Sequence, residues 1–347
     1  MAAGVAAVLV VAVTGAYVAS PRTEGLAGEW SAPSSDGEVV AGRALVSGGS
    51  AALDLRTGKS VRLGSVAGGA ATYADDRLIV SKDGRVDSVR LDASVRWTWR
   101  APAGHVAIPL AAAAGSTLVA DCPAEAGKTC RLVGLDSAGK PGWESTDAGR
   151  PVDQPEPSLP RIHAESVEGG GVLLTDPVSG RSTLQPGTSF TAVPDGPVVV
   201  PVQQGGQCVV SLFASPDPLW TQVLGPCPGG KVPEVSVSEG AVLLSWPGRT
   251  ERLATDTGAT LPRPTTTPVP GAVASSDGLV ATRRTAASLL DPRRWGEDDH
   301  VLELHDAGTG SVRATLVTES PVTVLLLDRD SLVVREEGRV VRYTLED

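Results

Sequence analysis

The chain is 347 residues long, enough for two domains of ordinary size or for one large repeat domain. Its 40 acidic side chains outnumber its 30 basic ones, and the net charge of −10 gives no electrostatic footprint for nucleic acid or for an anionic membrane surface. With 40 glycines, 27 prolines and 41% apolar residues, the composition excludes a collagen-like or linker-like chain and predicts a folded, loop-rich protein with a real core.

The first twenty residues are apolar. No charged residue occurs from Ala2 to Ala19, and a helix of this length would reach about 27 Å, the thickness of the hydrocarbon core of a bilayer. Residues 1–20 are therefore expected to form one transmembrane or signal-anchor helix. A cleaved signal peptide is the alternative, but a basic segment is missing before the apolar stretch, and a cut after Ser20 would leave Pro21 at the new N-terminus, which disfavours processing there.

Four cysteines follow, at Cys122, Cys130, Cys208 and Cys227. An even number of cysteines in an exported chain predicts disulfides, because an oxidising compartment preserves them. Of the three possible connectivities, Cys122–Cys130 with Cys208–Cys227 is favoured, since each of these pairs brackets a turn-rich stretch between two β-type runs. A zinc site is the alternative, but no histidine lies beside the cysteines and their spacing does not match the usual ligand pairs.

Past residue 33, short runs rich in valine and leucine alternate with turns rich in glycine, aspartate, serine and proline, a pattern typical of an all-β protein. A strand followed by Leu-Asp and a glycine-containing turn recurs in the segments 51–63, 88–99, 131–143, 209–220, 251–261 and 302–316. The residue after the leucine position is Asp54, Asp92, Asp136, Ala214, Ala254, His305 and, in a degenerate last copy, Thr344. Residues 162–187 supply one further unit, and its phase, Asp176 or Gln185, stays open. The result is eight units with a mean spacing of about 41 residues.

Units of this length cannot bury both faces of a sheet alone, so neighbouring units must stack, and radial closure removes the exposed sheet edges. The expected fold is an all-β, eight-bladed β-propeller of four-stranded blades over residues 21–347, preceded by the N-terminal helix. The last unit ends after its third strand. Because GEWSAP (28–33) resembles TWRAP (98–102), residues 25–33 are expected to supply the missing outer strand of the last blade.

The repeats resemble those of the quinoprotein-type eight-bladed propellers, in which Leu-Asp, a Thr-Gly-Lys type of turn and an apolar strand with a tryptophan follow one another. The segment LDLRTGKSVRL (53–63) is the best copy. The tryptophan position is filled by Trp30, Trp99, Trp143 and Trp220. A residue that recurs at one repeat position is expected to pack blade against blade rather than to form a ligand cage. WD-type repeats fit worse, because no Trp-Asp dipeptide ends a strand.

The resemblance implies pyrroloquinoline quinone with a calcium ion as the cofactor to look for. Quinoprotein dehydrogenases of this shape usually carry long insertions, an adjacent Cys-Cys pair and an asparagine among the ligands of the ion, whereas this chain has no Cys-Cys and no asparagine. We therefore expect no cofactor. The chain is similar instead to the non-enzymatic members of the family, which use the propeller as a binding platform, as in the envelope lipoprotein that assists outer-membrane assembly.

Other catalytic motifs are weak or missing in the sequence. Gly58–Ser60 and Gly127–Thr129 mimic the end of a phosphate-binding P-loop, but the upstream glycine is replaced and each lies in a turn between strands. Neither G-x-S-x-G nor H-E-x-x-H occurs. His305 stands at the aspartate position of its repeat and is expected to be a hydrogen-bonded turn residue rather than a catalytic base, since no nucleophile is placed beside it.

One stretch breaks the repeat: the interval before the seventh aspartate position is about ten residues longer than the mean, and the extra part includes DPRRWGEDDH (291–300). A loop held out by a rigid scaffold often carries function, and arginine with tryptophan is typical of binding hot spots. The expected contact site for a protein partner is therefore Arg293, Arg294 and Trp295. A solvated hairpin is the alternative. Calcium binding by the acidic residues that follow, Glu297, Asp298 and Asp299, is disfavoured because the spaced ligand pattern of a known loop is missing.

Together these features predict a single-pass cell-membrane protein whose propeller lies on the extracytoplasmic side. We expect it to bind another envelope or secreted protein as a scaffold, with no catalysis, no metal and no nucleic-acid partner. A quinone-dependent dehydrogenase, or another small-molecule enzyme on the same fold, is the alternative.

Overall fold

A computed structural model describes residues 23–34, 38–47, 51–63, 69–92, 95–125, 128–148, 158–193, 195–238, 241–246, 249–261, 272–276, 278–287, 298–307 and 309–346. Apart from one 3-10 turn at Pro228–Gly230, all the regular structure in these ranges is β, which confirms the all-β prediction. Residues 1–20, the expected membrane segment, lie outside the described residues. Within the described ranges, no helix has the length and apolar character needed to cross a membrane.

The described strands fall into two compact units, which we call unit 1 and unit 2. Unit 2 contains six antiparallel sheets, each with its strands side by side in chain order. Sheet by sheet, its strands are β2 (Val39–Ala41), β3 (Ala44–Ser47), β4 (Ala51–Asp54) and β5 (Ser60–Arg62); β6 (Ala70–Ala74), β7 (Arg77–Lys82), β8 (Arg85–Arg90) and β9 (Val95–Arg100); β10 (His105–Ala113), β11 (Ser116–Pro123), β12 (Cys130–Leu135) and β13 (Pro141–Ala148); β14 (His163–Ser166), β15 (Val172–Thr175) and β16 (Ser182–Gln185); β17 (Thr191–Ala192), β18 (Val198–Gln204), β19 (Gln207–Phe213) and β20 (Pro218–Pro226); and β21 (Glu234–Ser238), β22 (Ala241–Trp246) and β23 (Arg249–Ala254).

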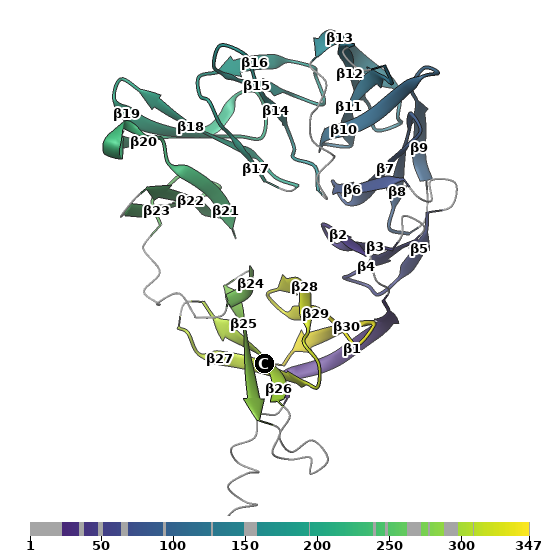
Figure 1. Cartoon of the computed structure of the whole chain (residues 1–347), viewed down its shortest axis with the longest axis vertical. Helices are drawn as coiled ribbons and strands as arrows, with labels where there is room; N and C mark the ends of the chain where they lie inside the picture. The colour runs from purple at the N-terminus through teal and green to yellow at the C-terminus, as the bar shows by residue number, and fades with distance from the viewer. Residues whose placement is uncertain are drawn as a thin grey trace, which may run out of the picture. The chain divides into compact units, whose positions relative to one another are not determined.

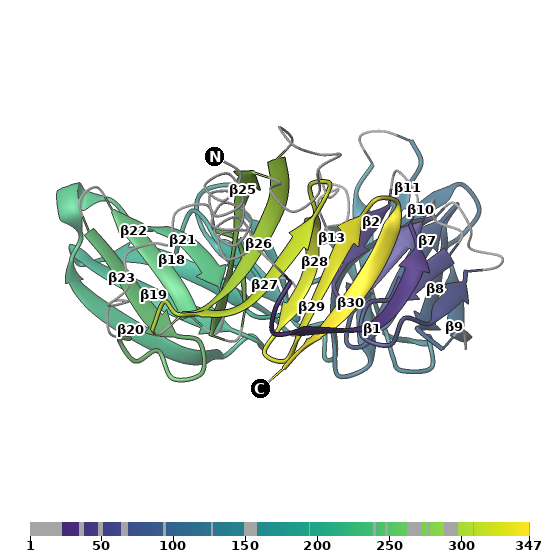
Figure 2. The same cartoon turned by 90° about the horizontal axis from the view of Figure 1, so that it is seen from below.

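Unit 1 contains two four-stranded antiparallel sheets. The first is β24 (Ala272–Ser276), β25 (Leu279–Ala287), β26 (Asp298–Asp306) and β27 (Val312–Thr318); the second, in spatial order, is β1 (Leu26–Pro33), β30 (Arg339–Leu345), β29 (Ser331–Glu336) and β28 (Thr323–Asp328). The strand expected at residues 25–33 is thus β1, which pairs with β30 over Leu26↔Leu345 to Pro33↔Arg339 (Figure 2). The first described strand therefore completes the sheet formed by the last three.

The core of unit 2 lies between neighbouring sheets. In each sheet the first strand lies on the inner side of the unit and the last strand on the outer side (Figure 1). Successive side chains of a strand point to opposite faces, so Leu78 and Val80 pack toward the sheet β2–β5, while Ile79 packs toward the sheet β10–β13. Both faces of these strands are buried, which explains why their sequences are runs of apolar residues rather than alternating patterns.

A turn that begins with aspartate recurs from sheet to sheet. At Asp176 the backbone N–H donates to the carbonyl of Arg181 at 3.0 Å, and the N–H of Gly180 donates back to the Asp176 carbonyl at 2.9 Å. Asp54 and Asp306 begin turns with the same pair of backbone bonds. The aspartate oxygens also accept N–H groups two or three residues further on, which is why this short carboxylate suits the position.

These turns settle two points of the repeat. The phase of the fourth unit is Asp176 and not Gln185, which ends β16. In the seventh unit the turn begins at Asp306, so the assignment of His305 to the aspartate position was one residue too early. The register of β26 with β27 also shifts here, between Leu304 and His305, which leaves Arg313 of β27 as the extra residue.

Three tryptophans pack one sheet against the next, as the repeat pattern predicts. Trp97, Trp143 and Trp220 each cover a glycine in the aspartate-type turn of the following sheet, at Gly139, Gly180 and Gly258 respectively. The indole N–H of Trp143 donates to the Pro177 carbonyl at 3.1 Å, and that of Trp220 donates to the Thr255 carbonyl at 2.9 Å. In β9 the tryptophan in this position is Trp97 and not Trp99, which is a correction to the sequence-based assignment.

Among the described residues, two sheets have three strands instead of the expected four. In the sheets β2–β5, β10–β13 and β24–β27 the aspartate turn joins the third strand to the fourth. In the sheet β14–β16 it joins β15 to β16, so these three strands correspond to the second, third and fourth strands of the other sheets, and no first strand is described. In the sheet β21–β23 the corresponding turn follows β23, and Thr260 forms an isolated bridge with Leu253; within the described ranges this sheet has no outer strand.

A short segment, Ser158–Ile162, directly precedes β14; we call it the strap. Backbone hydrogen bonds of 2.8–2.9 Å join it to Tyr73 of β6, to Ala112 of β10 and to Gly196 between β17 and β18. Leu159 of the strap is 2% exposed and packs in the apolar cluster between the sheets β6–β9 and β10–β13. The strap therefore joins three sheets of unit 2 along their inner strands.

Candidate functional site

Both expected disulfides are present. Cys122 of β11 is bonded to Cys130 of β12, and Cys208 of β19 is bonded to Cys227, which follows β20. Each bond joins neighbouring strands of one sheet, and both pairs of sulfurs are buried. The favoured connectivity is confirmed, and these cysteines are not zinc ligands.

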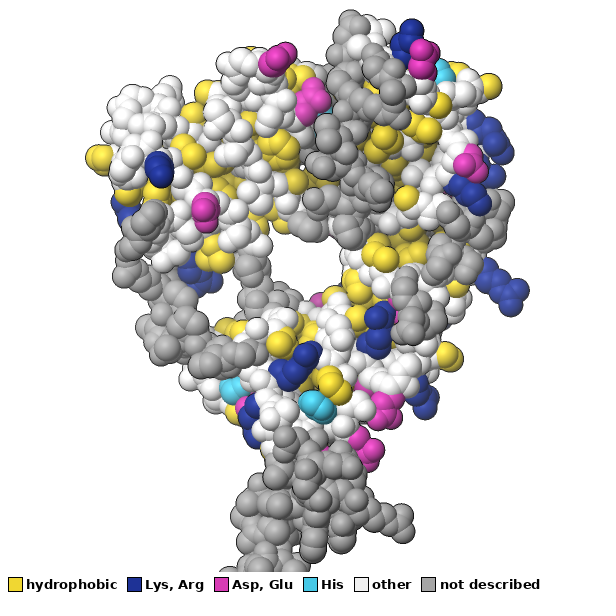
Figure 3. All heavy atoms as spheres, viewed as in Figure 1, with side chains coloured by type: hydrophobic (Ala, Val, Ile, Leu, Met, Phe, Trp, Pro, Cys, Tyr) yellow, Lys and Arg dark blue, Asp and Glu magenta, His cyan; other side chains and the backbone are white. Residues whose placement is uncertain are grey.

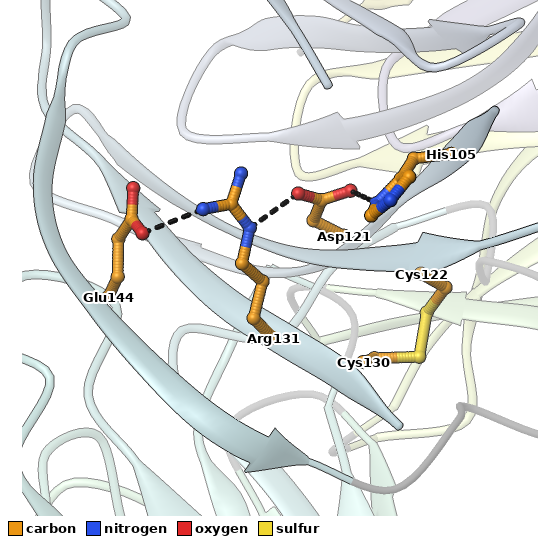
Figure 4. Close-up of polar contacts among 6 residues, drawn as sticks. All are labelled: His105, Asp121, Cys122, Cys130, Arg131 and Glu144. Carbon is orange, nitrogen blue, oxygen red and sulfur yellow. Dashed lines mark hydrogen bonds and ion pairs between the residues drawn. A yellow bond between two sulfur atoms is a disulfide. The ribbon is translucent and has the colours of Figure 1, made fainter. Parts of the chain in front are cut away.

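Beside the first disulfide, one polar side chain from each strand of the sheet β10–β13 enters a single network (Figure 4). The carboxylate of Asp121 is 0% exposed; one of its oxygens lies 2.7 Å from Nδ1 of His105 and the other lies 2.6 Å from Nε of Arg131. Arg131 also reaches Glu144 through Nη1 at 2.8 Å. The hydrogen bond to Asp121 raises the pKa of the Arg131 guanidinium above its usual value.

This network braces the sheet. A buried carboxylate is costly unless it is paired, and the two partners of Asp121, the His105 ring and the Arg131 guanidinium, meet that need. A carboxylate that holds a histidine ring is also part of acyl-transfer sites, but those sites place a hydroxyl or thiol within hydrogen-bond reach of the ring. In the described part of the chain, no such group is bonded to His105. The same part of the chain contains no cluster of ligand side chains suited to a metal ion.

His305 is a hydrogen-bonded residue at a turn, as expected. Its Nδ1 lies 3.3 Å from the carbonyl of Gly310, and its Nε2 lies 3.0 Å from the hydroxyl of Thr282 on β25. The Glu303 carboxylate lies 3.5 Å from Nε2. Thr282 is a hydroxyl neighbour that the sequence did not indicate, because it comes from another strand. Thr282 is 5% exposed, and the cluster joins β25 to the turn after β26.

Unit 1 contains a pocket of about 480 Å³ at one end of its two sheets. It is lined by Gly278, Leu279, Asp306, Arg313 and Arg329. These residues come from the turn before β25, the first residue of β25, the end of β26, the start of β27 and the turn between β28 and β29. A pocket of this size can hold a small organic molecule. No sequence signal pointed to it, because the two arginines come from different repeats.

The insertion expected to bind a partner falls in a part of the chain that the structure does not describe. Arg293, Arg294 and Trp295 lie outside the described residues, as does Glu297, and β26 begins at Asp298. The face of the molecule in Figure 3 has basic and acidic side chains scattered over both units rather than gathered over one group of strands.

No family model and no curated protein matches the chain. Among solved structures, it is similar to BamB from Moraxella catarrhalis at 16% identity, covering 87% of this chain and 81% of that one, with a TM-score of 0.30. It is also similar to the Dos1 propeller at 12% identity, over 93% of this chain and 95% of that one, with a TM-score of 0.39. A europium-containing methanol dehydrogenase matches at 13% identity, over 89% and 78%, with a TM-score of 0.31. Identities and scores this low carry no argument about family or activity.

Proposed function

We propose that the chain is an extracytoplasmic β-propeller that serves as a scaffold for another envelope or secreted protein, held to the cell membrane by residues 1–20. In this proposal each of the eight sheets is one blade, and β1 closes the last of them. The recurring aspartate turns and the tryptophans that cover them support the repeat. The two disulfides support an oxidising compartment, where such bonds persist.

The scaffold role rests on one observation: the clustered polar side chains bond strands and turns of the same sheet to one another. The network of His105, Asp121 and Arg131 spans the strands of one sheet, and the cluster of His305 joins a strand to its own turn. Both clusters hold the strands of their sheets together. Surface binding is then the function that such a frame serves best.

The compartment is tested by peptide mapping of protein isolated from its native cells, with thiols alkylated at lysis. We expect Cys122 to be recovered with Cys130, and Cys208 with Cys227, without reduction. Fractionation of the same cells should place the full chain with the cell membrane, and a variant without residues 1–20 should be lost from that fraction. Free thiols at all four cysteines would contradict the extracytoplasmic proposal.

The partner contact is tested at the insertion. Replacing Arg293, Arg294 and Trp295 together by alanine should leave the melting temperature within the range of the parent and weaken capture of the partner by crosslinking in intact envelopes. The control replaces two exposed arginines and one exposed apolar residue elsewhere, Arg90, Arg100 and Leu219, by alanine. Equal capture by both variants would remove the insertion as the contact site.

The absence of quinone chemistry is tested by adding pyrroloquinoline quinone and calcium to the purified full-length chain, followed by absorption spectroscopy after gel filtration. The scaffold proposal expects no retained chromophore. Quinone bound in a one-to-one ratio would overturn it in favour of a quinone-dependent enzyme on the same fold.

A further inference from the structure

The pocket of unit 1 presents two arginines that have no partner among the described residues. Neither Arg313 nor Arg329 makes a hydrogen bond or ion pair through its guanidinium with any residue in the described ranges. Their neighbours in unit 1 differ: Arg284 is paired with Glu303 at 2.7 Å, and Arg342 with Glu29 at 3.1 Å. In a chain with a net charge of −10, two unpaired cations that face one pocket form a local positive site.

The backbone holds both arginines in fixed places. Arg313 lies at the register shift between β26 and β27, and such a shift redirects a side chain. Its carbonyl faces Gly25, where a Cβ would come within 2.7 Å of the oxygen, so the chain before β1 lies directly against this strand. Glu24 and Thr315 then exchange two backbone hydrogen bonds of 2.9 Å. The strand that carries Arg313 is thus bonded on both sides.

Arg329 is held by its turn. Asp328 pairs with Ser331 across the turn between β28 and β29, and the N–H of Leu345 donates to the carbonyl of Asp330 at 3.0 Å. Both guanidiniums therefore project from backbone that neighbouring strands fix, and a ligand that binds them does not need to order the backbone first.

The chemistry of the lining selects a class of ligand. A guanidinium presents two parallel N–H groups that match the oxygens of a carboxylate or a phosphate. The third charged group, Asp306, accepts the N–H of Thr309 at 2.7 Å and its hydroxyl at 3.0 Å. It reduces the net charge of the lining to one positive unit and disfavours a second anionic group beside it. A carboxylate can accept further hydrogen bonds from ligand hydroxyls.

From this geometry we propose that the pocket binds a small polyhydroxylated organic anion, with one carboxylate or phosphate group between Arg313 and Arg329 and its hydroxyls toward Asp306. A sugar acid or a sugar phosphate has this chemistry and fits a volume of about 480 Å³. The proposal does not depend on the scaffold role, because a propeller with or without a protein partner could carry this site.

Isothermal titration calorimetry on the purified full-length chain tests the proposal with four probes: glucuronate, glucose 6-phosphate, inorganic phosphate and glucose. We expect glucuronate or glucose 6-phosphate to bind and glucose not to bind. Arg313→Gln and Arg329→Gln together should weaken binding by at least about tenfold, since each removes a charge-assisted hydrogen-bonding group. The control is Arg339→Gln, an exposed arginine at the opposite end of the same sheet, which should bind as the parent does.

The two anions distinguish the sources. Binding of glucuronate alone assigns a carboxylate ligand, and binding of glucose 6-phosphate alone assigns a phosphate ligand. Binding of inorganic phosphate without either sugar anion would overturn the proposal, as would failure of all four probes at millimolar concentration. So would an equal loss in the Arg339→Gln control. Because the exchanged arginines are exposed, thermal melting should show all variants folded, which keeps a negative result interpretable.

Discussion

The strap offers the sharpest test of how unit 2 is held together. Leu159→Ala removes a side chain that is 2% exposed and that packs with Ala74, Ile79 and Ala112. The change leaves the backbone bond from residue 159 to the carbonyl of Tyr73 in place, so the loss reports the side chain alone. Buried leucine-to-alanine changes cost about 2–5 kcal/mol, because the lost transfer free energy is added to that of the cavity. With Ala74 and Ala112 as small neighbours, we expect about 2–3 kcal/mol.

Urea unfolding followed by tryptophan fluorescence measures this loss, since Trp97, Trp99, Trp143, Trp220 and Trp246 all lie in unit 2. The free energy of unfolding falls by about 1–3 kcal/mol for each molar unit of urea, so the urea concentration at the unfolding midpoint should fall by about 1 M or more. The matched control is Leu184→Ala on β16, where the side chain is 59% exposed and the expected change is within about 0.5 kcal/mol. If both variants unfold at the midpoint of the parent, the strap is not packed as described and does not join the sheets.

Three further changes test other features. Asp121→Ala should lower the free energy of unfolding by about 1–3 kcal/mol, because it leaves two partly buried hydrogen-bonding groups, those of His105 and Arg131, without their acceptor; chemical denaturation measures it. Gly258→Ala should lower the melting temperature more than Gly205→Ala, since both sites have positive φ but only the first would bring its Cβ to 2.7 Å from an indole ring. Burial raises the pKa of the Asp195 carboxyl above the ordinary 3.8, so its contribution to stability is fully present below pH 3.8 and is lost as the pH rises through the folded-state pKa. The Asp195→Asn variant has no carboxyl group to ionise at this position. Its free energy of unfolding relative to the parent should therefore increase with pH in a series of urea titrations.

Each of these outcomes has a clear opposite. An Asp121→Ala protein as stable as the parent would mean that the network is a surface feature. Equal losses at Gly258 and Gly205 would mean that backbone strain, and not the indole contact, decides the cost. Parallel pH profiles for the parent and Asp195→Asn would show that the carboxyl titrates as it does in the unfolded chain.

The features that the sequence predicts are those encoded by local patterns. An aspartate followed by a glycine-containing turn is a short-range signal, because the side chain bonds to its own turn, and Asp54 and Asp136 were found by it. The cysteine pairs followed from the turns that they bracket. The similarity of residues 28–33 to 98–102 identified β1 as an outer strand, since outer strands share one environment.

The features that the sequence does not predict depend on register or on distant strands. Trp97 and Trp99 point to the same face of β9, because side chains alternate with a period of two, so the periodicity cannot tell which of them covers the next turn. The seventh turn begins at Asp306 and not at His305, which only its backbone hydrogen bonds reveal. Arg313 and Arg329 belong to different repeats, and only the packing of two sheets brings them to one pocket.

The pairing of β1 with β30 has a consequence for synthesis and export. The strand made first receives its partner only when the last residues of the C-terminal sheet have been made, so a chain that emerges N-terminus first carries an unpaired strand throughout its synthesis. An exposed strand edge is a template for wrong pairing and a target for proteases. In a chain truncated before β30, β1 therefore stays unpaired, and such a chain should be degraded. Only a chain that includes β30 can pair this strand.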